Sequence, residues 1–311
     1  MTKNDVKRIL LENDNYLILT HTRPDGDTIG SAAALCAALR RIGKTAYLYP
    51  NPEITDTYRE FSDEFIINEI PENFFHLSVD TAAENMLPLG YEGKVRLAID
   101  HHGSNSFYAE NTYVESDKAA CGQIIMDIIE DTCGSIALKE AELLYVAVST
   151  DTGCFMYGNT NADALRAGAK LLELGVNNGE LNKKLFRSMS LSRLKLEGLI
   201  YSSMRSYRNN TVNIVVITQD MMNEAGADEN DCDDLASLAG KVKGSIVSVT
   251  IRELVDGRCK ASVRTTPAVN ASDICAEYGG GGHAMAAGCT MNVSPWECVD
   301  LMLKAVEKHY K

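Results

Sequence analysis

The sequence predicts an α/β protein in which a larger N-terminal domain with a mainly parallel sheet is joined by a helical connector to a smaller α/β domain. The chain has 311 residues, more than one hydrophobic core usually serves. Apolar residues make up 45% of it, which supports globular folding. In the first half, short apolar runs alternate with helical patterns, which is typical of βαβ units. These observations together favour two α/β domains.

In the first domain, strands are expected where a short apolar run ends in polar residues, at 16–21, 74–80, 95–101 and 143–150. Apolar residues recur every three or four positions over 28–42, which Gly43 closes, and over 119–131, so both stretches are expected as helices. The same pattern covers 161–174 and 178–204. Because 178–204 has a polar face, we expect it to connect two domains. These are placed at 1–190 and 211–311, with a connector at 191–210.

The second domain is expected to hold strands at 211–218, 245–254, 258–265 and 286–293. Helices are expected near 231–239, 271–278 and 295–309. The acidic run 220–234 has seven carboxylates and no basic residue. We interpret it as a solvated loop and helix start rather than as a metal site.

Composition excludes several classes of partner. The net charge of −13 argues against binding long nucleic acid, so a nucleotide partner should be small. The nine cysteines are never closer than nine positions apart, which excludes a CxxC zinc or redox centre and is typical of reduced thiols in the cytoplasm. No apolar run reaches the roughly 18 to 20 residues of a membrane span, and the amino terminus has no signal-peptide pattern. We expect a cytoplasmic protein without a membrane partner.

Polar residues that could bind metal follow the first expected strand. His21, Asp25 and Asp27 lie within seven residues, and a Pro-Asp-Gly turn brings them together. Open parallel sheets present their ligand sites at this edge. The two carboxylates could therefore point at two cations. Alternatively, Asp25 is only a turn residue and Asp27 only a helix N-cap.

The other three expected strands end in the same way. Asp80 follows the second, and by itself would be interpreted as a helix cap. The third ends in Asp100, His101 and His102, and the fourth leads to Asp151. Three of the six histidines in the chain fall in these clusters, which disfavours an explanation by packing alone.

A run of four glycines at 279–282 precedes His283. Four glycines cost much conformational entropy, so they imply a close approach of the backbone to a ligand or a sharp bend. Their amides could form an anion-binding nest. A flexible linker is the alternative, but the run lies inside a domain, between an expected helix and an expected strand.

The order and placement of these clusters resemble the four motifs of DHH phosphoesterases. The resemblance implies that Asp80 bridges two divalent ions, of which the first is bound by His21, Asp25 and Asp80 and the second by Asp27, Asp80, His101 and Asp151. Mixed imidazole and carboxylate ligands favour manganese, with magnesium or cobalt as substitutes. It also implies that Asp100 orients its neighbouring histidine. His102 would then contact the scissile phosphate or protonate the leaving oxygen.

The glycine run is similar to an element of the DHH-associated C-terminal domain, which recognises substrate. This implies that the far phosphate of the substrate is bound by Arg264, Gly280, Gly281, Gly282 and His283. The active site is then expected in the cleft between the two domains.

Within the superfamily, the stretch 149–160 is most similar to the NrnA-like group, which degrades short oligoribonucleotides and dephosphorylates 3′-phosphoadenosine 5′-phosphate. The expected partner is thus a small nucleotide or short single-stranded RNA, and a homodimer is one option. A phosphodiesterase for cyclic dinucleotides such as c-di-AMP, or for their linear products, is the alternative. A noncatalytic nucleotide sensor is disfavoured because every expected metal ligand is present. A dinucleotide-dependent oxidoreductase is disfavoured because no GxGxxG follows the first strand.

Overall fold

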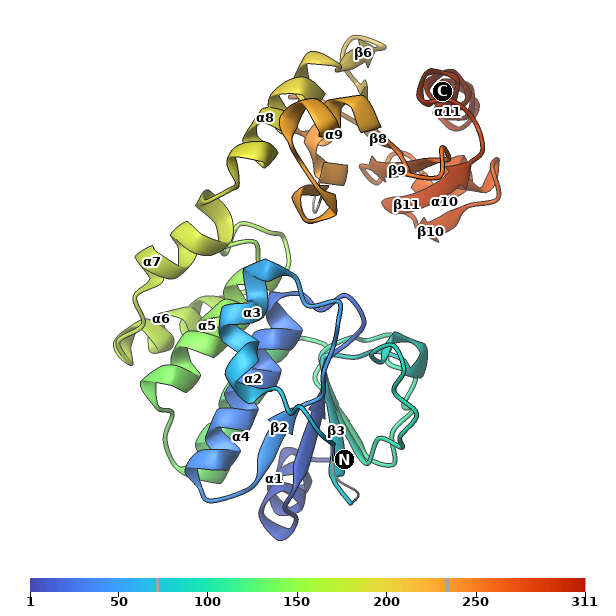
Figure 1. Cartoon of the computed structure of the whole chain (residues 1–311). Helices are drawn as coiled ribbons and strands as arrows, with labels where there is room; N and C mark the ends of the chain where they lie inside the picture. Colours follow the sequence, from blue (N-terminus) through green and yellow to red (C-terminus); the bar gives the residue numbers. More distant parts are fainter. Residues whose placement is uncertain (71–72, 233–234, 311) are drawn as a thin grey trace. The chain divides into compact units, whose positions relative to one another are not determined.

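The computed structural model describes residues 1–70, 73–232 and 235–310 (Figure 1). The chain divides into two compact units, Met1–Ser188 and Met189–Lys311. Residues 191–210, expected as a connector, lie within the second unit. The α/β class is confirmed, with a parallel sheet in the first unit and a mixed sheet in the second.

The first unit is built on a five-stranded parallel sheet in the order β2-β1-β3-β4-β5. Its strands are β1 Tyr16–Leu19, β2 Ala46–Leu48, β3 Phe75–Val79, β4 Leu97–Asp100 and β5 Thr112–Val114. All four residues of β1 are buried, as expected of a central parallel strand covered on both faces. Three of the four predicted strands of this unit are confirmed, whereas the short β2 and β5 were not predicted.

The helices of this unit are α1 Lys3–Glu12, α2 Gly26–Arg41, α3 Asp56–Ser62, α4 Cys121–Cys133, α5 Leu138–Asp151, α6 Ala162–Glu173 and α7 Asn178–Asn182. Helix α2 packs against both α4 and α5 (Figure 1). The approach to α5 is close, because a Cβ added at Gly30 would lie 2.4 Å from the carbonyl oxygen of Leu143. The helices predicted at 28–42, 119–131 and 161–174 are confirmed as α2, α4 and α6.

The strand predicted at 143–150 is wrong, because these residues form most of α5. Residues 143–149 are all buried, so the helix has no polar face to reveal its period. A short, continuous apolar run fits a buried strand and a buried helix equally well. Tertiary packing decided for the helix here, with α5 enclosed by α2, α4 and α6.

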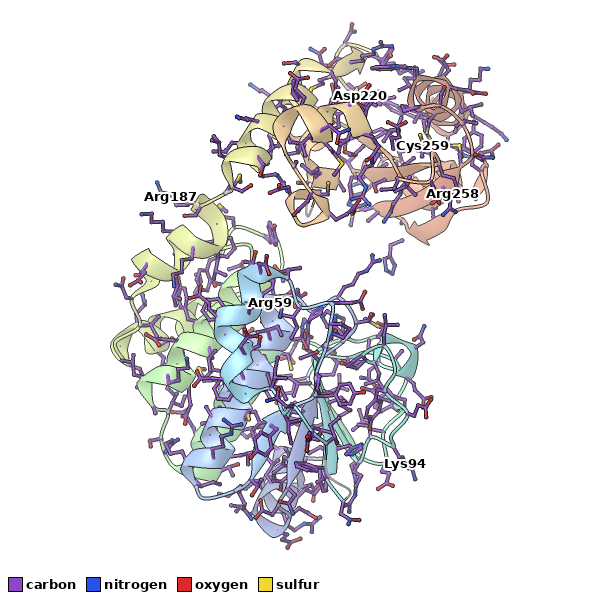
Figure 2. The ribbon with its side chains drawn as sticks, in the orientation of Figure 1. Arg59, Lys94, Arg187, Asp220, Arg258 and Cys259 are labelled. Atoms are coloured by element: carbon purple, nitrogen blue, oxygen red, sulfur yellow. The ribbon has the colours of Figure 1, made fainter. Side chains whose placement is uncertain are left out.

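The helical stretch predicted at 178–204 is interrupted. After α7, residues Lys183–Arg187 form a π-helical turn. The turn ends at Arg187 (Figure 2). Ser188 is extended, with φ −111° and ψ 129°, and α8 Leu191–Ser202 then begins. The interruption coincides with the division between the two units.

The second unit has a six-stranded sheet in the order β10-β11-β9-β8-β7-β6. Its strands are β6 Arg205–Tyr207, β7 Val212–Ile217, β8 Val247–Glu253, β9 Cys259–Thr265, β10 Gly281–His283 and β11 Ala286–Met291. Strand β9 begins at Cys259, directly after Arg258 (Figure 2). Only β7 and β8 pair in parallel, and the four predicted strands are confirmed as β7, β8, β9 and β11.

Helices cover both faces of this sheet. They are α8, α9 Gln219–Ala225, α10 Ala271–Ala276 and α11 Pro295–His309. Alternate residues of β7 separate two cores, since Val216 packs with α10 and α11 while Val215 packs with α8 and α9. The helix predicted near 231–239 forms 3-10 turns at Glu229–Cys232 and Leu235–Lys241, and residues 233 and 234 of the acidic run lie outside the described residues. Among the described residues, none of the helices combines the length and apolar character needed to cross a membrane.

Candidate metal centre

The loop after β1 presents the first group of predicted ligands. Asp25 is the N-cap of α2, and its Oδ1 accepts hydrogen bonds from the amides of Asp27 (3.0 Å) and Thr28 (3.2 Å). The capping role considered for Asp27 therefore belongs to Asp25. The oxygen that caps α2 also lies 3.6 Å from Nε2 of His21.

Asp27 is buried at the start of α2 and is held by a second helix. Its carboxylate accepts from the amides of Cys121 (2.6 Å) and Gly122 (2.9 Å), at the N-terminus of α4, and from the hydroxyl of Ser31 (3.0 Å). Backbone amides at a helix N-terminus favour a negative charge. Nevertheless, burial and the nearby carboxylates of Asp80 and Asp151 raise the pKa of Asp27 well above its ordinary value. This is a carboxylate whose negative charge lacks a sufficient counter-charge.

Asp80 directly follows β3 and has left-handed backbone geometry, with φ +55°. This conformation is costly for a residue other than glycine, and such costs are typical of functional sites. The side chain is 2% exposed, and Oδ1 accepts no hydrogen bond, although Nε2 of His101 lies 3.4 Å away. A buried carboxylate oxygen without a partner costs free energy. It is therefore a strong candidate for a metal ligand.

The ring orientations of His21 and His101 leave one nitrogen of each free. Nδ1 of His21 lies 2.7 Å from the carbonyl oxygen of Thr22, and Nδ1 of His101 lies 3.2 Å from that of Lys118. Because a carbonyl only accepts, Nδ1 carries the proton in the neutral ring of each histidine, and Nε2 then has the free lone pair. Histidines that bind metals are usually held in this way. Nε2 of His101 lies 3.8 Å from an oxygen of Asp151.

The structure brings all six predicted ligands together around Asp80. Nitrogen and oxygen atoms within 4.8 Å of one another form three groups: His21, Asp25 and Asp80; Asp27, His101 and Asp151; and Asp80, His101 and His102. The first two groups come from five different segments of the chain: the loop after β1, the start of α2, and the ends of β3, β4 and α5. The predicted position of Asp151 near the cluster holds, although it ends a helix rather than a strand.

Crowding of like charges shifts the pKa values of this cluster. Burial and the neighbouring Asp80 raise the pKa of Asp151 to about 6. Burial alone would lower the pKa of His21, but Asp25 and Asp80 raise it to about 9. Burial likewise opposes protonation of His101, whereas Asp80 and Asp27 raise its pKa to about 10. The cluster thus holds protons tightly when no other cation is present, and its donor set of imidazole nitrogens and carboxylate oxygens fits divalent metal ions.

Comparison with known proteins decides the family. Residues 15–148 match the model of the DHH family, N-terminal domain, and residues 209–311 match that of the DHHA1 domain. The chain is 35% identical over 280 residues to the bifunctional oligoribonuclease and PAP phosphatase NrnA of Thermus thermophilus. The aligned region covers 88% of this chain and 83% of that protein. The chain belongs to the DHH family. The resemblance in the four motifs is thereby confirmed, and the chain is a hydrolase of the divalent-metal-dependent DHH phosphoesterase class.

One further relative and two solved structures are similar to this chain. NrnA of Bacillus subtilis is 25% identical, over 98% of this chain and 97% of that protein. An exopolyphosphatase-related protein from Bacteroides fragilis shares the fold with a TM-score of 0.85 at 23% identity, covering 98% of this chain and 95% of the other. The fold is also that of a structure of exonuclease RecJ bound to manganese, with a TM-score of 0.53 at 13% identity over 98% and 94% of the two chains.

Sequence reasoning missed residues that support the first DHH motif. Asn51 is 5% exposed, and its amide donates to the hydroxyl of Thr20 (3.0 Å) and to the carbonyl of His21 (2.9 Å). Its oxygen accepts from the amide of Glu53 (3.0 Å), whose carboxylate accepts in turn from the hydroxyl of Thr22. These contacts hold the loop that carries His21. The sequence offered no signal for them, because both residues follow the unpredicted strand β2.

Arg264 and His283, predicted to bind substrate, lie on β9 and β10, the two strands on either side of β11. In the sheet, Arg264 of β9 pairs with Ala286 of β11, which pairs on its other side with His283 of β10. Directly paired residues share one face, so Arg264 and His283 flank a small alanine, with backbones about 10 Å apart from two strand spacings. Both are exposed.

The last two glycines of the run, Gly281 and Gly282, begin the edge strand β10, whereas Gly279 lies in the turn before it. The close approach of the run is to β11, since a Cβ at Gly280 would lie 2.3 Å from the carbonyl oxygen of Gly288. Gly282 has φ +148°, and a Cβ there would lie 2.6 Å from the carbonyl oxygen of Ala286. The close approach to β11 thus requires glycine at 280 and 282, whereas Gly281 has open space around it.

Proposed function

We propose that this chain hydrolyses short oligoribonucleotides and 3′-phosphoadenosine 5′-phosphate with the aid of two divalent ions, for which manganese is the favoured metal and magnesium or cobalt can substitute. The observation that carries this proposal is that Asp80, whose buried Oδ1 lacks a hydrogen bond, belongs to one ligand group and lies 3.4 Å from Nε2 of His101, which belongs to the other. The first ion would be held by His21, Asp25 and Asp80, and the second by Asp27, Asp80, His101 and Asp151. The substrate class is supported by the 35% identity to an oligoribonuclease and PAP phosphatase.

When bound, the two ions supply Lewis acidity that favours ionisation of water and neutralises charge on phosphate oxygens. The chain itself supplies a proton donor. Nδ1 of His102 lies 2.8 Å from Oδ1 of the buried Asp100, so this carboxylate accepts a hydrogen bond from the Nδ1–H group and fixes the orientation of the ring. Asp100 retains a pKa below its ordinary value despite burial, because His102 and Asn105 donate to it.

In the proposed reaction, the bond from phosphorus to the leaving oxygen breaks as a bond from the water oxygen to phosphorus forms. The leaving oxygen takes the proton from Nε2 of His102. The proton lost by water passes to solvent, and solvent returns one to the imidazole. No covalent intermediate with the protein is required.

We propose that the second domain, 211–311, binds the substrate. The guanidinium of Arg264 suits a terminal phosphate because its planar fork can donate two parallel hydrogen bonds. His283 lies in the same cross-strand row and adds a further donor. The amides of Gly280, Gly281 and Gly282 would complete the phosphate site.

A product-resolved assay with Mn²⁺ tests the substrate class. It compares 3′-phosphoadenosine 5′-phosphate, RNA of two to five nucleotides, a long single strand of RNA and c-di-AMP. We expect the first two to be cleaved fastest. A clear preference for the long strand would contradict the proposal, and with it the argument from the net charge of −13.

A cyclic-dinucleotide phosphodiesterase is the second candidate. One relative is the cyclic-di-AMP phosphodiesterase GdpP of Geobacillus thermodenitrificans, which is 21% identical over 98% of this chain. The chain spans only 49% of that protein. Faster cleavage of c-di-AMP than of RNA dinucleotides in the same assay would favour this candidate.

A further inference from the structure

We propose that Asn105 is a positioning residue for the reaction. Through Asp100, it keeps a proton on Nδ1 of His102, so that the proton given to the leaving oxygen is the one on Nε2. This inference rests on the proposed function in so far as it assigns a purpose to His102. The arrangement itself can be tested without turnover.

The side chain of Asn105 is 7% exposed and uses each of its polar groups. Its amide nitrogen donates to Oδ2 of Asp100 (2.7 Å) and to the carbonyl of Thr81 (3.2 Å). Its oxygen accepts from the amide of Phe107 (2.7 Å). A carboxylate and a carbonyl can only accept, so the amide has one orientation that satisfies all three contacts.

Asp100 divides its two oxygens between Asn105 and the histidines. Oδ1 accepts from Nδ1 of His102 (2.8 Å) and from the amides of His101 (2.8 Å) and His102 (3.2 Å). Among the described residues, Oδ2 accepts a hydrogen bond only from Asn105. The carboxylate is 0% exposed, so water cannot easily replace this donor. Without Asn105, Oδ2 would be a buried carboxylate oxygen with no donor, and Asp100 would hold the ring of His102 less firmly.

A purely structural role for Asn105 is the competing explanation. Its contacts with Thr81 and Phe107 join the segments that follow β3 and β4, and Phe107 has left-handed backbone geometry with φ +54°. Loss of loop shape would act on every substrate and would not depend on His102. Action through His102 would be confined to substrates whose leaving group needs a proton. This difference decides the experiment.

The kinetic test is a double-mutant cycle of Asn105→Ala and His102→Ala, measured with Mn²⁺ on a 5′-phosphorylated RNA dinucleotide and on bis(p-nitrophenyl) phosphate. We expect Asn105→Ala to lower kcat for the dinucleotide about tenfold, as for the loss of a hydrogen bond to a charged group, with KM nearly unchanged. The p-nitrophenyl ester should be cleaved at nearly the wild-type rate, because its leaving group departs without a proton. In the His102→Ala background, Asn105→Ala should cause no further loss.

The matched control is Asn111→Ala, which removes one exposed amide that donates to the carbonyl of Arg96 (3.0 Å). It should leave both activities unchanged. Equal losses on both substrates from Asn105→Ala, or the same loss in the His102→Ala background, would overturn the proposal. Affinity for Mn²⁺ should be unchanged in Asn105→Ala, since Asp100 is not among the proposed ligands.

A spectroscopic test separates this inference from the proposed function. In ¹⁵N-histidine-labelled, Mg²⁺-loaded wild type, at a pH at which the ring of His102 is neutral, its signal, assigned by its absence in His102→Ala, should be that of a ring protonated at Nδ1. In Asn105→Ala, the signal should shift towards a mixture of tautomers. A wild-type ring that lacks the Nδ1 proton would overturn the inference even if Asn105→Ala does not fold. If the wild type cleaves neither substrate, the proposed function fails, while the spectra still decide on Asn105.

Discussion

At the scale of single residues, Asp80 combines three costly properties. It has left-handed backbone geometry, it is buried, and one carboxylate oxygen lacks a hydrogen bond. Its pKa is raised, first by burial and then by Asp25, against the opposing effect of the histidines. Such a residue destabilises the metal-free fold and is retained at functional sites.

For Asp80→Asn, we therefore expect opposite effects on function and on stability. Loss of a residue that only supports a metal ligand weakens metal binding by up to about 100-fold. Removing a charged ligand shared by both proposed ions should therefore weaken Mn²⁺ binding by more than about 100-fold and should abolish turnover. The metal-free variant should be at least as stable as the metal-free wild type, because one of several crowded, buried carboxylate charges has been removed. Calorimetric titration and urea unfolding measure the two effects.

The control for this change is Asp300→Asn, on the exposed face of α11. It should bind Mn²⁺ and turn over as the wild type does. Undiminished turnover in Asp80→Asn would refute the proposed sharing of Asp80 between the ions.

For Arg264, we expect a change in substrate binding rather than in chemistry. Arg264→Ala should raise KM for 3′-phosphoadenosine 5′-phosphate about tenfold with kcat nearly unchanged, since a charge-assisted contact to a remote phosphate is lost. Lys260→Ala is the matched control, because Lys260 lies four residues earlier on β9 and is also exposed. A fall in kcat at constant KM would assign Arg264 to the chemical step instead.

At the scale of elements, α2 and α5 define how the first unit is packed. Gly30 of α2 faces the backbone of α5 so closely that a Cβ would lie 2.4 Å from the carbonyl oxygen of Leu143 and 2.8 Å from the amide nitrogen of Ala147. Neither atom can move without shifting the helix. Since α2 begins at Asp25 and Asp27 and α5 ends at Asp151, this contact also sets the spacing of candidate ligands.

Gly30→Ala should therefore destabilise the protein by about 1 to 3 kcal/mol through overpacking. Gly198→Ala in α8 should have the opposite sign, because no atom lies within 4 Å of the added Cβ and alanine favours a helix over glycine by roughly 0.5 to 1 kcal/mol. Urea unfolding of the metal-free proteins measures both. A neutral Gly30→Ala would show that the two helices can separate at little cost.

The elements also show where prediction from sequence succeeds. Strands β1, β3 and β4 were predictable because each is a short apolar run that ends in a polar cluster. Strand β5 has three half-buried residues and was not predictable from periodicity. Helix α5 was predicted as a strand, because burial on all sides removes the polar face that distinguishes a helix.

At the scale of the whole molecule, the cluster links stability to pH. The folded-state pKa values of His21 and His101 are raised to about 9 and about 10 from an ordinary value of 6.5. At pH values between 6.5 and these raised pKa values, the folded protein binds more protons than the unfolded chain. The free energy of unfolding of the metal-free protein should therefore fall as the pH rises from 6.5 to 9, and the contribution should be fully present below 6.5.

Metal ions should replace these protons. The rise in the melting temperature of the first unit on adding Mn²⁺ should be larger at pH 8.5 than at pH 6.5, as followed by far-UV circular dichroism. Fluorescence of Trp296, the one tryptophan of the chain, provides an internal control, since it lies in α11 of the second unit, which has separate cores. Metal-free stability that rises with pH over this window would contradict the protonation of the cluster.

The sequence by itself determined the α/β class, the family and the six candidate ligands, because these depend on residue identity and on the local pattern at strand ends. Only the tertiary structure decided that 143–150 is helical, that Asp80 has left-handed geometry, and that the glycine run leads into an edge strand. It alone revealed the supporting contacts of Asn51 and Asn105. The physical reason is that these features depend on packing and hydrogen bonds between segments distant in the chain, on which local periodicity carries no information.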